Sequence, residues 1–105
     1  MAERKDLMLE QIQSVTGHRQ SGSLRVLLTR RGVVSSGVFP DPNLWPPKKV
    51  YAADEVWHAL SHRILRHVAA HPEAADACWE MFEEQIRNAR SVQAVRAAFA
   101  DRLDA

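Results

Sequence analysis

Four of the five prolines fall within ten residues, in the segment PDPNLWPPKK at 40–49. Proline has no backbone N–H and restricts the residue before it, so neither a helix nor a continuous strand ladder runs through this segment. We therefore interpret residues 40–49 as an extended connector between two differently patterned halves. Neither half is long enough to bury a sufficient core alone, so residues 1–105 are expected to form a single small globular domain.

The half after the connector has the apolar period of helices. A stripe at four-residue steps predicts a helix over 52–70, with Asp54 as its cap. Pro72 breaks this helix and suits the first position of the next, which is predicted over 73–89. Ser91 is expected to cap a last helix. The inward residues of the three helices are predicted to include Val56, Leu60, Ile64, Val68, Ala75, Cys78, Trp79, Phe82, Ile86, Val92, Val95, Phe99 and Leu103.

The half before the connector changes its period. Residues 2–15 have helical spacing of apolar residues, and Gly17 is a suitable stop. Residues 24–39 are rich in β-branched residues and alternate, which predicts a β-hairpin closed by Gly32 in a left-handed conformation. The chain is thus predicted to be a mostly helical α+β protein: an N-terminal helix, a β-hairpin, a Pro-rich connector and a three-helix C-terminal part in one domain.

Charge is distributed unevenly along the chain, although the net charge is only +1. Residues 1–50 hold eight Lys or Arg against four Asp or Glu, whereas residues 51–105 hold six against nine. A chain this bipolar is not typical of strongly basic nucleic-acid binders. Its two charged surfaces are expected to attract each other or to select charged partners.

Four of the five histidines lie in VWHALSHRILRHVAAHP, residues 56–72, as two H-x-x-x-H pairs. Zinc-binding helices use this spacing, which places two side chains one turn apart. On a helical wheel the two pairs fall about 180° apart, so four histidines cannot share one site. His58 and His62 share a face with Glu55. Arg66 on that face disfavours a cation, and the H-E-x-x-H order is absent. We therefore expect no metal and no cofactor.

Cys78 is the only cysteine, which excludes an intramolecular disulfide and a thiolate-rich zinc site. It is expected to be a small buried hydrophobic side chain. No apolar run approaches the roughly 18 residues of a membrane span, and the charged start MAERKDLMLEQ is unlike a secretory signal. We expect a cytoplasmic protein that does not bind membranes. Its content of Ala, Arg and Val suggests a bacterial or phage origin.

These features bear differently on three classes of function. The chain contains no Gly-rich phosphate loop, no nucleophile elbow and no paired catalytic carboxylates, so it is not expected to be an enzyme. The alternative is a nucleic-acid-binding transcriptional regulator. It would use a basic hairpin tip at Arg30 and Arg31 together with the two last helices, where Gln93 and Arg96 point outward. The acidic helix over 73–89 opposes this alternative by repelling phosphate.

The preferred hypothesis is a small non-enzymatic regulator or inhibitor that binds another protein through charged surfaces. Either the basic hairpin and connector or the acidic face of the helix over 73–89 would form the contact. The unpaired edge of the hairpin would also allow a homodimer. The residues expected to bind the partner are Arg25, Arg30, Arg31, Lys48, Lys49, Glu80, Glu83 and Glu84.

Overall fold

The computed structural model describes residues 5–38, 43 and 48–104 of the chain. Over these residues it has five α-helices, one 3-10 turn and a three-stranded antiparallel sheet, so the predicted class, mostly helical α+β, is confirmed. In chain order the elements are β1 (Asp6–Met8), α1 (Leu9–Thr16), α2 (Ser21–Arg30), β2 (Gly37–Val38), β3 (Lys49–Ala52), α3 (Ala53–Ala70), the 3-10 turn η1 (Pro72–Ala74), α4 (Ala75–Asn88) and α5 (Gln93–Leu103). Most of the predicted connector, 40–49, lies outside the described residues, and its end is the start of β3.

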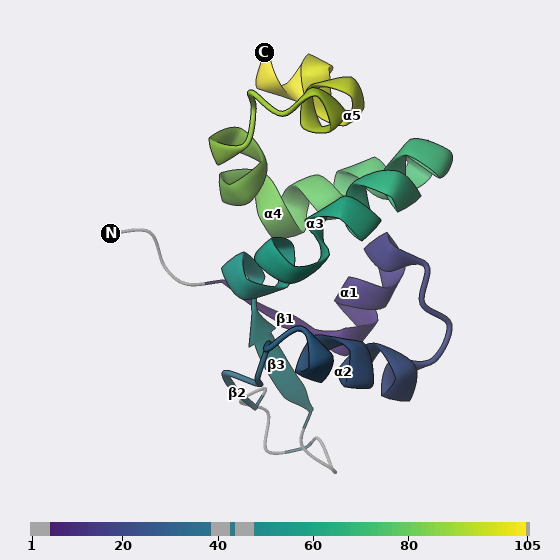
Figure 1. The fold of residues 1–105 in the computed structure, drawn as a ribbon, viewed down its shortest axis with the longest axis vertical. Coiled ribbons are helices and arrows are strands. Elements are labelled where there is room, and N and C mark those ends of the chain that lie inside the picture. The colour runs from purple at the N-terminus through teal and green to yellow at the C-terminus, as the bar shows by residue number, and fades with distance from the viewer. Residues whose placement is uncertain (1–4, 39–42, 44–47, 105) are drawn as a thin grey trace.

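The elements are arranged around α3 (Figure 1). The sheet, α1 and α2 lie at one end of the molecule, α3 and α4 cross the middle, and α5 covers the other end. Helix α3 packs against α1, α4, α5, β3 and η1, which confirms that the helix predicted over 52–70 is central. No helix among the described residues is long and apolar enough to cross a lipid bilayer.

Strand β3 is the middle strand of the sheet, and β1 and β2 pair with it on either side. Leu7 of β1 lies opposite Tyr51, and Gly37 of β2 lies opposite Val50. Leu7, Val50 and Tyr51 are all buried. The chain passes from β3 directly into α3, where the N–H of Ala53 donates to the carbonyl of Lys5 at 2.9 Å. The sheet therefore fixes the position at which α3 begins.

The β-hairpin predicted over 24–39 is wrong, because most of its first half is helix α2. Leu24 and Leu28 are fully buried, while Val26 between them is 51% exposed. Leu27 packs beside the buried pair, which gives the three- and four-residue spacing of a helix face. Leu and Arg also favour helices over strands. The part of this segment that does form a strand, β2, pairs with β3 on the other side of the connector.

Gly32 adopts the predicted left-handed conformation, with φ of 79°, but it ends a helix there instead of closing a hairpin. Its N–H donates to the carbonyl of Thr29, and the N–H of Val33 donates to that of Leu28. This bond pattern is a Schellman motif, which satisfies carbonyls that the helix end would leave unpaired. Val33 is buried in the same core as Leu28, so the motif also fixes the direction in which the chain leaves α2.

The helix predicted over 2–15 begins later than expected, at Leu9, and residues 2–4 lie outside the described residues. The preceding segment, Asp6–Met8, forms strand β1 because β3 supplies an antiparallel partner for it. The side chain of Gln11 then caps the helix by accepting from the N–H of Met8 at 2.8 Å. Gly17 ends the helix with φ of 76°, as predicted.

The C-terminal helices were predicted nearly correctly, but their caps were not. Ala52 and Val92 are the N-caps of α3 and α5, so the predictions that Asp54 and Ser91 would cap them are wrong. Helix α3 begins at Ala53, one residue before Asp54, because the bond from Ala53 to the sheet sets its start. Pro72 begins η1, and α4 follows it.

The core is one cluster that draws on every helix. The predicted stripe of α3 is buried throughout, and the rings of Trp57 and Phe82 lie 5.3 Å apart between α3 and α4. Trp79 and Phe99, 6.0 Å apart, join α4 to α5. Val92 is an exception among the predicted inward residues, since it is 48% exposed at the start of α5. These contacts hold α4 against both α3 and α5.

Candidate binding grooves

Two stretches of the chain contain no Asp or Glu at all, residues 11–40 and 56–72. Together they carry six arginines and all five histidines. The first stretch supplies most of α1 and all of α2, the second supplies most of α3, and α1 packs against both of these helices. Folding therefore gathers the acid-free stretches on one side, while carboxylates gather on α4 and at the start of α3.

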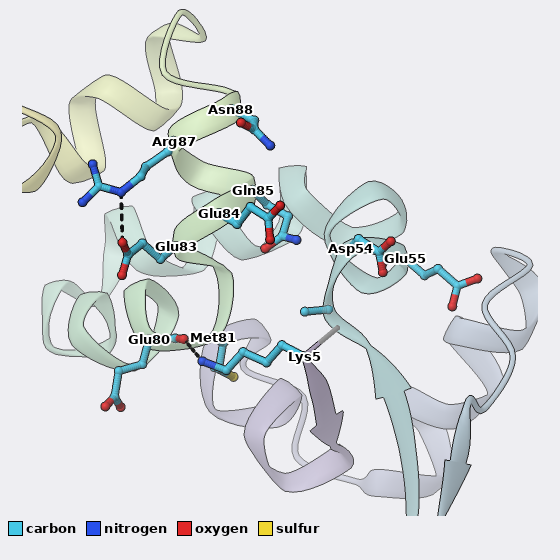
Figure 2. Close-up of a pocket in the computed structure, with 11 residues that line it drawn as sticks. Lys5, Asp54, Glu55, Glu80, Met81, Glu83, Glu84, Gln85, Arg87 and Asn88 are labelled. Carbon is cyan, nitrogen blue, oxygen red and sulfur yellow. Dashed lines mark hydrogen bonds and ion pairs between the residues drawn. The ribbon is translucent and has the colours of Figure 1, made fainter. Parts of the chain in front are cut away.

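An open groove of about 890 Å³ lies between the start of α3 and α4, and we call it the acidic groove (Figure 2). Its charged lining consists of five carboxylates and two cations: Asp54, Glu55, Glu80, Glu83, Glu84, Lys5 and Arg87. The carboxylates come from two elements that are far apart in sequence. Figure 2 shows Glu84 projecting from α4 towards the start of α3, where Asp54 lies. The apolar residues Ala53 and Met81 also line the groove and are almost fully buried.

Both cations of the acidic groove already have partners. The ammonium of Lys5 donates to the main-chain carbonyl of Glu80. Nε of Arg87 donates to Oε2 of Glu83 at 3.0 Å, and its guanidinium lies 5.0 Å from the centre of the Trp79 ring. Among the described residues, the carboxylates of Glu80 and Glu84 have no hydrogen bond or ion pair. These two carboxylates are therefore available to a cationic partner.

A second groove, of about 650 Å³, lies along α3 where the ends of α1 and α2 approach it, and we call it the basic groove. Its charged and titratable lining consists of three arginines and three histidines: Arg31, Arg63, Arg66, His62, His67 and His71. In the part of the chain that the structure describes, no carboxylate lines this groove. In addition, none of the three guanidinium groups forms a hydrogen bond or an ion pair with a described residue.

One histidine of the basic groove, His67, has a pKa that its surroundings lower. His67 lies against Gly17, and its ring stacks on His71 with 4.5 Å between the ring centres. Burial, and secondarily the charge of His71, lower the pKa of His67, against a smaller opposing effect of Glu73. Nδ1 of His71 lies 3.3 Å from a carboxylate oxygen of Glu73. The fold therefore favours the neutral form of His67.

His18, in the loop between α1 and α2, has an unusual environment. Burial lowers its pKa, and the nearby charge of Arg63 lowers it further. Its Nδ1 is buried and has no hydrogen-bond partner among the described residues. An unpaired buried polar atom costs free energy, so this nitrogen is a site of local instability close to Arg63.

The structure brings the predicted acidic residues together but disperses the basic ones. Glu80, Glu83 and Glu84 all line the acidic groove. By contrast, Arg25 and Arg30 are exposed on α2, and only Arg31 lines the basic groove.

The two predicted lysines lie apart from that groove. Lys48 is paired with Glu10, with 2.6 Å between Nζ and Oε1, and this hydrogen bond lowers the pKa of Glu10. Lys49 is exposed at the start of β3. The predicted hairpin tip is absent because its arginines end a helix, and the strand that follows among the described residues, β2, has two residues.

Sequence reasoning missed two residues of the basic groove, Arg63 and Arg66, as binding candidates. The sequence did contain an indication of these two residues, because no Asp or Glu lies between Glu55 and Glu73. The helical wheel also placed the two histidine pairs on opposite faces of the helix, whereas His62, His67 and His71 line one groove. The groove takes in about half the circumference of α3, with Arg63 near its middle, so it reaches both pairs.

The pair His58 and His62 does not act as a unit in the structure. His58 lines a small hollow with Asp54 and Glu55, whereas His62 lines the basic groove. Over the described residues, no three His, Cys, Asp or Glu side chains are grouped so that they could hold a metal ion. Cys78 is fully buried, as predicted, and burial raises the pKa of its thiol to about 12.

Comparison with protein-family models, with curated proteins and with solved structures found no significant match for this chain.

Proposed function

We propose that the protein is a small non-enzymatic regulator or inhibitor, of bacterial or phage type, that acts in the cytoplasm by binding another protein. The contact is the acidic groove, and the partner presents a segment rich in Lys and Arg. The observation that carries this proposal is the state of the charges in the groove. Carboxylates from two elements converge there, both local cations form hydrogen bonds, and the carboxylates of Glu80 and Glu84 have no partner among the described residues.

The groove favours an electrostatic interaction with modest affinity. Its apolar residues, Ala53 and Met81, expose 1% and 5% of their surface, so little apolar area remains for a partner to cover. Complementary charge raises the association rate and selects partners more than it adds affinity. Exposed charges are also screened over about 10 Å at 0.1 M salt. Binding should therefore be micromolar and should weaken as salt is added.

The reactive side chains that the structure describes give no support to an enzymatic function. The thiol of Cys78 is buried and strongly disfavours ionisation, whereas a nucleophilic cysteine needs a lowered pKa and access to substrate. Tyr51 is buried in the sheet with 3% of its surface exposed. Neither side chain lines a groove described above.

Charge-reversal variants provide the experimental test. The wild-type chain is used as bait in its native host, and the co-purifying protein is identified by mass spectrometry. Glu80→Lys with Glu84→Lys should abolish recovery of that protein. Asp101→Lys with Asp104→Lys is the matched control, because both residues are exposed near the chain end, outside the groove, and the change in charge is equal. Undiminished binding by the first variant would refute the proposal.

Nucleic-acid binding remains the second candidate, and one observation favours it: six arginines lie in acid-free stretches. Arg25 and Arg30 are exposed on α2, and Gln93 and Arg96 are exposed on α5. The predicted basic hairpin, however, is not formed. Binding to a mixed DNA or RNA pool should fall with salt by roughly one decade per decade for each phosphate contacted. Failure to retain nucleic acid at low salt would remove this candidate.

A further inference from the structure

We propose that the basic groove is a binding site for a small ligand that carries two or more phosphate groups. The site is separate from the acidic groove, since no residue lines both. It does not depend on the protein-binding function proposed above. The argument rests on the origin of its cations, on their lack of partners and on the shape of the groove.

The three arginines reach the groove from two elements that packing holds in place. Arg63 and Arg66 are three residues apart on α3, so they share a face of that helix. Arg31 lies at the end of α2, where the bonds of Gly32 and Val33 to the helix fix the backbone. Guanidinium groups bind phosphate through paired, charge-assisted hydrogen bonds. Because no described carboxylate occupies these donors, they are available to an anion.

The charge of the arginines indicates how many phosphate groups the ligand has. Three permanent positive charges in one groove repel one another, and an anion of similar charge relieves this repulsion. A single phosphate carries about −1.5 to −2 charge at neutral pH, which is too little to balance all three. A diphosphate or triphosphate provides enough charge and enough oxygens to reach both elements.

The histidines can supply further hydrogen-bond donors to the same anion. His62, His67 and His71 line the groove, and His18 lies near Arg63. An imidazole donates from one ring nitrogen when neutral and from both when protonated, so each can donate to a bound phosphate oxygen. The nearby negative charges are Glu73 of η1, which is already close to His71, and Asp54 and Glu55, which line a separate small hollow beside Arg31.

The shape of the groove favours a small molecule over a long nucleic acid. Its volume of about 650 Å³ is typical of ligand sites, and Leu27, Ala59, Leu60 and Ala70 supply an apolar part of the lining. Such a lining can accommodate the uncharged part of a nucleotide. A duplex would instead need cations spread along an extended face, and Arg25 and Arg30 lie outside the groove.

The test is isothermal titration calorimetry of the full chain with three probes: inorganic phosphate, inorganic tripolyphosphate and ATP. Wild type should bind tripolyphosphate with a Kd below about 1 mM, and inorganic phosphate more weakly. Arg63→Ala with Arg66→Ala should weaken tripolyphosphate binding by about tenfold or more. Arg25→Ala with Arg30→Ala removes the same charge from exposed positions on α2 and should change it by less than about threefold. Circular dichroism of both variants confirms that they remain folded.

The probes distinguish a nucleotide from a free polyphosphate as the source of the phosphate groups. Tighter binding of ATP than of tripolyphosphate would indicate a nucleotide, and equal binding would indicate a free polyphosphate; either result supports the site. The proposal is overturned if neither probe binds, or if both double variants lose binding equally. It is also overturned if a short oligonucleotide binds far more tightly than ATP and loses that binding in both variants.

Discussion

Gly17 lies directly against His67: a β-carbon added to Gly17 would be 2.9 Å from Nδ1 of the imidazole. Real side chains essentially never approach this closely. The contact joins the end of α1 to the face of α3 that lines the basic groove. It also explains why the chain has a residue without a side chain at this point, in addition to the positive φ that ends α1.

Gly17→Ala is therefore expected to destabilise the protein by about 1–3 kcal/mol, from the strained backbone and the clash with His67. Urea unfolding measures the change. Gly22→Ala is the control, because nothing lies within 4 Å of a β-carbon there and the residue is in α2. That control should stabilise the protein by up to about 1 kcal/mol. Equal effects of both substitutions would contradict the role assigned to the contact.

Stability should fall as the pH falls below about 6.5, because burial lowers the pKa values of His18 and His67 in the folded state. The unfolded chain then binds more protons than the folded chain, so the free energy of unfolding decreases through this range and levels off below the folded pKa values. His67→Gln should reduce this dependence.

The measurement is urea unfolding between about pH 7.5 and pH 5. The range ends there because Glu10, whose pKa is lowered by Lys48, contributes a further loss of stability at lower pH. An unfolding free energy that rises on acidification, or a variant with undiminished dependence, would show that the histidines are not held neutral by the fold.

Cys78 is expected not to react with a thiol reagent such as Ellman's reagent while the protein is folded. The side chain is fully buried, and the pKa of about 12 leaves almost no thiolate at neutral pH. Unfolding in urea should expose one reactive thiol per chain. Rapid reaction of the native protein would mean that α4 opens or that the thiol has a different environment.

The purified protein, without an affinity tag, is expected to carry no stoichiometric zinc. His58 and His62 line different hollows, and Arg66 shares the groove with His62. Elemental analysis checks this. One zinc per chain, lost on replacing His58 and His62 by Ala, would contradict the expectation.

The C-terminal helices could be predicted because the spacing of their apolar and polar residues is compatible with a helix and not with a strand. Leu60 and Ile64 belong to a stripe with the polar residue His62 midway between them, and a strand would place all three on one face. Leu24 and Leu28 are also four apart, but Val26 between them made the segment equally compatible with a strand. Only the packing of α2 in the core, which leaves Val26 exposed, distinguishes the two. Strand β1 depends on pairing with β3, and such a distant partner leaves no local signal.

The two grooves also differ in how far the sequence could predict them. Glu80 and Glu84 are one helical turn apart on one element, so the acidic surface was evident from spacing alone. The basic groove needs Arg31 from α2 beside Arg63 from α3, and no local pattern specifies how those helices pack. The signal available in the sequence was the lack of Asp and Glu in residues 11–40 and 56–72.

The central claim, that the acidic groove contacts a partner protein, is tested most directly by site-specific photo-crosslinking in the native host. A photoreactive amino acid is placed at Glu84, in the groove, or at Asp104, an exposed position outside it. We predict one discrete protein adduct from position 84 and none from position 104. The adduct should disappear when Glu80→Lys is added. An adduct from position 104 but not 84, or one unaffected by Glu80→Lys, would contradict the claim.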